Sequence, residues 1–389
     1  MSGGPLLRRA VVMVVSIAML AVVAPWVPFN HAPDRPLARS QVDGTSRGIT
    51  PALKVAVADP DRDPIDVTFF GREVVSSTPV EEPFTVVVVP DPQKYVSTVE
   101  LSATYRAQMR WIVASRQTLG TEFVVAVGDL VQRDESITQW KRANRAWQIL
   151  DRFRVPYSVV PGNHDMAAGG GAELYDRLFP PERYEATPWY GGYLGDPTDG
   201  IPDPADRGNK DSYQLFTAAG SDFLVLNLEM DLPVAAVRWA DDVIDAFPDR
   251  HVILVTHRWM DREGVRWRGP LYRRDVPVLA PERAWRDLVV PNCSVFMVIA
   301  GHDYGEAHRQ DVNACGEPVF QLLTDYQDRP NGGDGWLRYY TFRPEEATIE
   351  ATTFSVTRSG ARAYERDADS RFALPWRASD PGFTRIGVA

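Results

Sequence analysis

The sequence Val159-Val160-Pro161-Gly162-Asn163-His164-Asp165 is an apolar run that ends abruptly in glycine, amide, imidazole and carboxylate. A strand end with these residue types can present a metal ligand, a proton donor and a group that orients the donor. Other apolar runs along the chain also stop at polar residues. We therefore expect the function to depend on where the fold places these ends.

The runs before this stretch predict strands that alternate with helices. An unbroken apolar strand over 84–89 ends at Asp91 and Gln93, and a strand over 123–127 ends at Asp129. Helices are expected near 105–117 and 140–153. Such a series forms a parallel sheet whose carboxyl strand ends share one edge, so the polar residues are expected to meet there.

The second half of the chain predicts another sheet. A strand over 251–257 ends at His257, and a strand over 295–300 ends at Gly301-His302. The part from Val319 onward is β-rich. Two facing mixed β-sheets flanked by helices predict a four-layer αββα sandwich of the α/β class. The glycine-, proline- and aromatic-rich segment over 166–210 is expected to be an irregular loop that faces the substrate.

The N-terminus predicts export. Arg8 and Arg9 precede an apolar run that reaches Phe29. This run is long enough for a signal anchor, and a cleaved signal peptide is the alternative. Both place the protein outside the cytoplasm, either anchored to the membrane or secreted. The predicted parts are an anchor or signal peptide (1–29), a linker (30–50), a β-hairpin resembling the end of an immunoglobulin- or cadherin-like repeat (51–80), the main domain (81–357) and a C-terminal extension (358–389).

The charge balance limits the class of substrate. A formal net charge of -10 and a pI near 5.2 argue against broad nucleic-acid binding, which needs a basic face. Small anionic or ester substrates remain open.

The polar strand ends have the composition of a metal cluster. Carboxylate and amide oxygens bind hard divalent cations, whereas imidazole nitrogens suit zinc, iron or manganese. A carboxylate on a central strand can bridge two ions ~3.5–4 Å apart, as two-metal hydrolases require. The residues concerned are Asp91, Gln93, Asp129, Asn163, His164, Asp165, His257 and His302.

These motifs, taken in order, resemble the calcineurin-like metallophosphoesterase superfamily. The similarity is greatest to an exported bacterial branch with Asp-x-Gln as its first motif, here 91–93, and Gly-His-x-x-Gly-Glu-Ala as its last, here 301–307. The segment 326–333, Tyr-Gln-Asp-Arg-Pro-Asn-Gly-Gly, also resembles that branch. The resemblance implies hydrolysis of a small phosphate mono- or diester by attack of a metal-bound water or hydroxide. A catalytically degenerate member that acts as a binding or cell-envelope structural module is the alternative.

The resemblance also implies two divalent metal ions, with manganese, iron, zinc or calcium as candidates. Asp129 would bridge them, and Asn163, His257 and His302 would complete one site. Asp91 would belong to the other site, together with Gln93, which stands in the place of a histidine. Tyr304 replaces a second histidine there, so this site is expected to be weak, oxygen-rich or empty. His308, four residues later, is a candidate substitute ligand.

Several further roles follow from the same resemblance. His164 is expected to donate a proton to the leaving oxygen, with Asp165 fixing its ring. Arg258, Arg309 and Tyr304 are candidates for contact with the substrate, and solvated surface arginines are the alternative for the first two.

The two cysteines lie on either side of the last metal motif. The paths from Cys293 to His302 and from there to Cys315 are nearly equal in length, so both residues are expected at the edge of the sheet away from the site. With export, this placement predicts a disulfide bond.

Overall fold

The computed structural model describes residues 37–38, 55–56, 82–272 and 275–376 of the 389-residue chain. The chain divides into two compact units, Met1–Val80 with Thr198–Gly200, and Glu81–Pro197 with Ile201–Ala389. The predicted export segment lies outside the described residues, as does the second strand of the predicted hairpin. Among the residues that are described, no helix combines the length and apolarity that a bilayer span needs.

The described residues of the first unit include a short pair of strands. β1 (Leu37–Ala38) pairs antiparallel with β2 (Val55–Ala56). β1 therefore lies within the segment that was expected to be a linker.

The second unit contains two sheets. Their strand orders are β15-β14-β13-β3-β4-β5 and β11-β12-β10-β9-β8-β7-β6. The six-stranded sheet consists of β3 (Phe84–Val89), β4 (Thr121–Ala126), β5 (Tyr157–Val159), β13 (Trp336–Arg343), β14 (Thr348–Ser355) and β15 (Ala373–Pro375). The seven-stranded sheet consists of β6 (Tyr190–Leu194), β7 (Gly208–Ala218), β8 (Ser221–Leu228), β9 (His251–Thr256), β10 (Val295–Ala300), β11 (Gly305–Val312) and β12 (Pro318–Asp325).

The apolar side chains of β3 are divided between two cores. Val86 and Val88 pack in a cluster that also contains Ile253 and Val255 of β9, so this cluster lies between the sheets. Val87, in contrast, packs with residues of the helices. A strand that is buried on both faces needs an unbroken apolar run, which explains the sequence of this segment.

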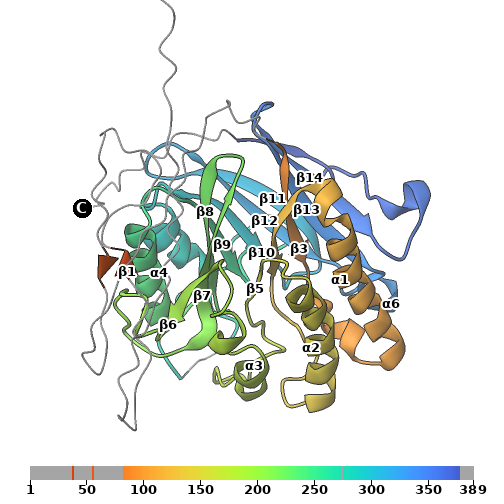
Figure 1. Cartoon of the computed structure of the whole chain (residues 1–389), viewed down its shortest axis with the longest axis horizontal. Helices are drawn as coiled ribbons and strands as arrows, with labels where there is room; N and C mark the ends of the chain where they lie inside the picture. The colour runs from red at the N-terminus through yellow and green to blue at the C-terminus, as the bar shows by residue number, and fades with distance from the viewer. Residues whose placement is uncertain (1–36, 39–54, 57–81, 273–274, 377–389) are drawn as a thin grey trace, which may run out of the picture. The chain divides into compact units, whose positions relative to one another are not determined.

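Helices cover the outer face of each sheet (Figure 1). α1 (Val99–Leu119) and α2 (Ile137–Arg152) pack on the six-stranded sheet through large side chains such as Trp140 and Trp147. α4 (Val234–Ala246), α5 (Pro281–Ala284) and the π-helical turn η3 (Trp285–Val289) pack on the seven-stranded sheet. The predicted four-layer sandwich is therefore confirmed.

Parallel pairing directs the strand ends to one edge of each sheet. β3, β4 and β5 are parallel neighbours. β8, β9, β10 and β12 are likewise parallel. The loops that follow these strands are consequently the ones that can form a common site.

Two regions differ from the sequence prediction. The segment 166–210 is not a single irregular loop, because it contains α3 (Glu173–Leu178), β6 and the start of β7. β7 was not predicted, because its buried positions include Asn209, Asp211 and Gln214 and its sequence therefore lacks the apolar alternation typical of a strand. The main domain also continues beyond residue 357, as β15 pairs with β14 and buries Leu374.

The remaining short helices of the described residues are η1 (Pro92–Val96), η2 (Pro181–Arg183), α6 (Pro330–Gly333) and η4 (Gly360–Ala363).

Candidate metal centre

Tight turns at the strand ends place three of the candidate ligands. Asp91 after β3, Asp129 after β4 and His302 after β10 adopt φ values of 33°, 53° and 76°. This left-handed region is uncommon for residues other than glycine and clusters at functional sites. Each of these residues follows a buried strand by two or three positions, so its backbone is anchored by the sheet.

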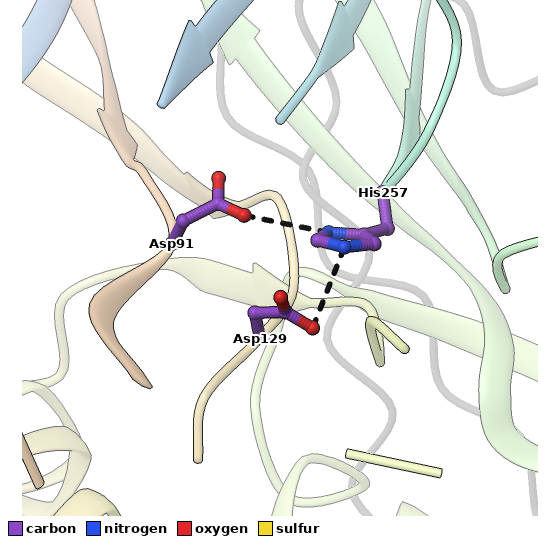
Figure 2. Close-up of side chains that lie close together, drawn as sticks. All are labelled: Asp91, Asp129 and His257. Atoms are coloured by element: carbon purple, nitrogen blue, oxygen red, sulfur yellow. Dashed lines mark ion pairs between the residues drawn. The ribbon is translucent and has the colours of Figure 1, made fainter. Parts of the chain in front are cut away.

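Asp91, Asp129 and His257 form a buried group that could hold a metal ion (Figure 2). Nδ1 of His257 lies 3.8 Å from Oδ1 of Asp91, and Nε2 lies 3.4 Å from Oδ1 of Asp129. Nδ1 also donates to the backbone oxygen of Val127 at 2.7 Å. This hydrogen bond fixes the ring and leaves the Nε2 lone pair as the one available to a metal.

Asn163 and His302 complete this side of the centre. Nε2 of His257 lies 3.0 Å from Oδ1 of Asn163 and 3.2 Å from Nδ1 of His302. Nδ1 of His302 lies 2.8 Å from the same Asn163 oxygen. The Asn163 oxygen and the two imidazole nitrogens, which come from three loops, are all within hydrogen-bonding distance of one another. Lone pairs this close together are stable only if a proton or a cation lies between them.

Two glycines are required by the close packing around the carboxylates. A Cβ atom on Gly162 would overlap Oδ1 of Asp129, and one on Gly301 would overlap Oδ2 of Asp91. The glycines in the Gly-Asn-His-Asp and Gly-His motifs therefore make room for ligands that come from other strands.

The charges in the centre shift the pKa values of its members. Burial, together with the carboxylates of Asp325 and Asp129, raises the pKa of Asp91 well above its usual value. Burial alone would also raise the pKa of Asp129, but the charge and hydrogen bond of His257 outweigh it and lower that pKa. Burial and the neighbouring His257 lower the pKa of His302 to about 3. His302 is therefore neutral at ordinary pH, the form in which imidazole binds metal.

The partner of the His164 ring, Gln132, was not among the predicted site residues. The His164 backbone N–H donates to Oδ1 of Asp129 at 2.9 Å, and its Nδ1 lies 2.9 Å from the backbone oxygen and 3.1 Å from Nε2 of Gln132. The expectation that Asp165 fixes the His164 ring is wrong. Both Asp165 oxygens are occupied by backbone N–H groups, those of Leu130, Val131 and Gly162 at 3.0, 2.9 and 2.9 Å.

Asp165 consequently has a structural role. It is fully buried and ties the loop after β4 to the loop after β5 through these three hydrogen bonds. Burial and the charge of Asp129 raise the pKa of Asp165 to about 7. The interaction fixes Asp129 and Asn163 relative to each other.

The other side of the centre is formed by amides. Nε2 of Gln93 donates to Oδ2 of Asp129 at 2.9 Å and to Oε1 of Gln327 at 2.5 Å. Gln327 and its neighbour Asp325, at the end of β12, were not among the predicted site residues. The signal was available, because the apolar strand over 319–323 leads directly to these polar residues.

Two other predicted site residues, His308 and Arg309, do not contact the metal centre. His308 does not join the centre as a substitute ligand, since its Nδ1 lies 3.2 Å from Asp369 and its ring stacks on Phe372. Arg309 binds Asp311 and the backbone oxygen of Gly264. Both residues are on β11, and both side chains contact loops outside the metal centre.

Arg258 and Tyr304 lie closer to the centre. The Arg258 guanidinium stacks on Trp267 at 4.2 Å and donates to the backbone oxygen of Gly269 at 2.9 Å. Its charge contributes to the lowered pKa of His302. Tyr304 is 49% exposed, and Nζ of Lys94 lies 5.3 Å from the centre of its ring. Tyr304 is thus on the surface beside the centre.

Cys293 and Cys315 form a disulfide bond with a Cα–Cα separation of 5.8 Å. Cys293 precedes β10 and Cys315 follows β11, so the bond joins the ends of these strands that lie away from the loop carrying His302.

The residues present fit a metal centre. Oδ2 of Asp91 and Oε1 of Gln93 are buried and have no hydrogen-bond partner within the described residues, a state that costs about 1–3 kcal/mol per group unless a ligand satisfies it. The donor set combines carboxylate, amide and imidazole groups, which suits divalent metals.

Comparison with known proteins identifies relatives of this chain. The family model described as calcineurin-like phosphoesterase matches residues 84–305. The uncharacterized protein YvnB of Bacillus subtilis (strain 168) is 28% identical over 297 residues, which cover 74% of this chain and 21% of that protein. The chain therefore spans about a fifth of the length of this curated relative.

Solved structures with a similar arrangement include phosphatases. A dimetal phosphatase from Danio rerio is 14% identical with a TM-score of 0.46, and the match covers 76% of this chain and 100% of that chain. The purple acid phosphatase PPD1 from yellow lupin (Lupinus luteus) is 12% identical with a TM-score of 0.43, with 84% and 58% coverage.

Proposed function

Because the chain belongs to the calcineurin-like phosphoesterase family, we propose that it is a metal-dependent hydrolase of a small phosphate mono- or diester. The observation that carries this proposal is the convergence of Asp91, Asp129, Asn163, His257 and His302 from five separate strand ends. Each is buried or partly buried, and each offers an oxygen or nitrogen atom to the same small region.

Two groups of residues would hold divalent metal ions. Asn163, His257 and His302 supply one group, Asp91 and Gln93 supply the other, and Asp129 lies between them. When bound, such ions make a water molecule acidic and neutralise the charge that builds up on phosphoryl oxygens.

We assign His164 the role of proton donor to the leaving oxygen. The backbone oxygen of Gln132 lies closer to Nδ1 than the Gln132 amide nitrogen does, which favours the neutral tautomer with its proton on Nδ1. Within the described part of the chain, Nε2 of His164 has no hydrogen-bond partner and is free for a substrate. Protonation of the ring at Nε2 therefore provides a general acid, a role that contributes ~10²–10⁴-fold to a rate.

Cationic side chains beside the centre suit an anionic substrate. Lys94 lies over the exposed Tyr304 ring, and Arg258 follows the ligand His257 directly. Nε of Arg258 is buried and has no hydrogen-bond partner among the described residues, so contact with a phosphate oxygen would need the Arg258 side chain to move from its stacking position on Trp267. Both residues are proposed substrate contacts.

We also propose that the protein acts outside the cytoplasm, attached to the membrane by its N-terminal segment or released from it. The Cys293–Cys315 disulfide supports this location, because such bonds persist in oxidising compartments. Labelling of the thiols in protein isolated without reductant tests this point, and two free thiols would contradict it.

A degenerate binding or envelope-structural module is the second candidate function. It is favoured by Gln93 and Tyr304, which stand where histidine ligands are expected. Metal analysis combined with an aryl phosphate assay separates the two. Two bound ions with metal-dependent turnover would support the hydrolase, whereas one tightly bound ion without turnover under manganese, zinc, iron or calcium would support the binding module.

A further inference from the structure

The side of the centre that lacks histidines is closed by residues from β12 and the loop after it. Ala300 of β10 is in register with Leu323 of β12, and the two strands are parallel. Asp325 therefore comes at the same edge of the sheet as His302. Asp325 is completely buried and Gln327 is 5% exposed.

Asp325 fixes the orientation of the Gln327 side chain. Its Oδ1 accepts from the Gln327 backbone N–H at 2.8 Å, and its Oδ2 accepts from Nε2 of Gln327 at 2.9 Å. An ionised carboxylate only accepts hydrogen bonds, so the amide nitrogen of Gln327 faces Asp325 when Asp325 is ionised. Its carbonyl oxygen Oε1 consequently faces the centre.

The amide nitrogen of Gln93 marks the point where several oxygens converge. It contacts both Oε1 of Gln327 and Oδ2 of Asp129. In the part of the chain that the structure describes, the Gln93 amide oxygen, in contrast, has no hydrogen-bond partner, and neither does Oδ2 of Asp91. A half-turn of the Gln93 amide would exchange its nitrogen and oxygen atoms. The Gln93 oxygen would then face Oε1 of Gln327 and Oδ2 of Asp129, and all the groups that meet there would be hydrogen-bond acceptors.

The charge around this point is unbalanced. Asp91, Asp129 and Asp325 are buried together, and the described residues include no lysine or arginine ion-paired with any of them. Within the same residues, Asp91 and Asp129 are ion-paired only with His257, which balances charge only when its ring is protonated. Burial of several carboxylates without a cation is strongly unfavourable. A bound divalent cation would remove this cost.

We propose that Asp91, Asp129, Gln93 and Gln327 form an all-oxygen site for a hard divalent cation such as manganese, with Asp325 as the residue that positions Gln327. This proposal rests on the proposed metal-dependent function and specifies the second ion. Carboxylate and carbonyl oxygens favour manganese, magnesium or calcium, whereas the imidazoles of His257 and His302 favour zinc or iron. The centre would therefore hold two chemically different ions.

Metal binding to the full chain tests the proposal without substrate. Metal-stripped protein receives one equivalent of zinc and is then titrated with manganese, followed by calorimetry and by the electron paramagnetic resonance signal of the bound manganese. Asp325→Asn should weaken manganese binding ~10–100-fold, the range for loss of a residue that orients a ligand, and leave the zinc content unchanged. Asp328→Asn is the matched control, since it removes the same charge from an exposed position of the same segment.

A second variant keeps the test decisive if Asp325→Asn fails to fold. Gln93→His restores an imidazole to the all-oxygen site and should raise the ratio of zinc to manganese affinity there by at least about tenfold. Equal manganese affinity in Asp325→Asn and Asp328→Asn would overturn the proposal, as would an unchanged metal ratio in Gln93→His. Hydrolysis is measured separately, so an inactive protein that shows the expected metal binding would refute only the proposed function.

Discussion

Replacement of His164 by alanine distinguishes the proton donor from the metal ligands. The His164 ring contacts only Gln132 among the hydrogen-bonding groups of the described chain, and none of the ligand side chains. Its backbone N–H, which donates to Asp129, remains in the variant. We therefore expect His164→Ala to retain both metal ions and a stability close to that of the wild type.

The expected kinetic loss follows from the role of a general acid. Removal of such a group lowers the rate ~10²–10⁴-fold, which corresponds to about 3–5 kcal/mol in activation free energy. The loss should be smaller for an aryl phosphate with an acidic leaving group than for an alkyl phosphate, because a weakly basic leaving oxygen needs little protonation. The assay compares kcat for both substrates together with the metal content of the same samples.

Asp129→Asn is the contrasting variant. Asp129 faces His257 and accepts hydrogen bonds from Gln93 and the His164 backbone, so it connects all parts of the centre. Its loss should remove metal as well as activity. Equal metal loss in His164→Ala and Asp129→Asn, or an equal rate loss for aryl and alkyl substrates in His164→Ala, would refute the assignment of His164 as proton donor.

Three further predictions concern stability and can be measured by thermal unfolding. Asp165→Asn should destabilise the fold by ~1–3 kcal/mol, because the single amide oxygen of asparagine cannot accept from all three backbone N–H groups and the asparagine NH₂ would face one of them. Asp165→Glu should also be destabilising, since its longer side chain places the carboxylate differently. Removal of metal with a chelator should lower the melting temperature, since an ion present at about 100 times its Kd stabilises the folded state by ~2.7 kcal/mol; an unchanged transition would contradict the metal centre. Cys293→Ser should cost about 3 kcal/mol because the disulfide closes a 22-residue separation, and reductant should lower the melting temperature of the wild type but not of the variant.

The sequence was sufficient to predict the sandwich and the first side of the centre. Strands such as β3 and β10 are unbroken apolar runs, and parallel sheets bring the residues that follow them to one edge. Asp91, Asp129 and His257 each come one to three residues after such a strand, so their meeting follows from topology.

Contacts that depend on side-chain direction were not predictable in the same way. Asp165 adjoins His164 in sequence, yet its carboxylate turns toward the backbone of the loop after β4, while the more distant Gln132 reaches the His164 ring. His308 was expected to compensate for Tyr304 because it is near in sequence. It lies on β11, where Asp369 and Phe372 engage its ring, and no periodicity reveals that contact.

Gln93, which stands in the place of a histidine, contacts a residue that follows β12 of the other sheet. An amide at position 93 binds metal more weakly than imidazole and leaves its own hydrogen-bonding groups to be satisfied. Gln327 supplies a partner for the Gln93 nitrogen, and Asp325 holds Gln327 in the one orientation that turns its oxygen inward. A lone substitution of histidine by Gln93 would only weaken the site. In the all-oxygen site proposed above, Gln327 and Asp325 accompany it and change the donor set from imidazole to oxygen, so that proposal accounts for the departure from the family pattern by a change of metal.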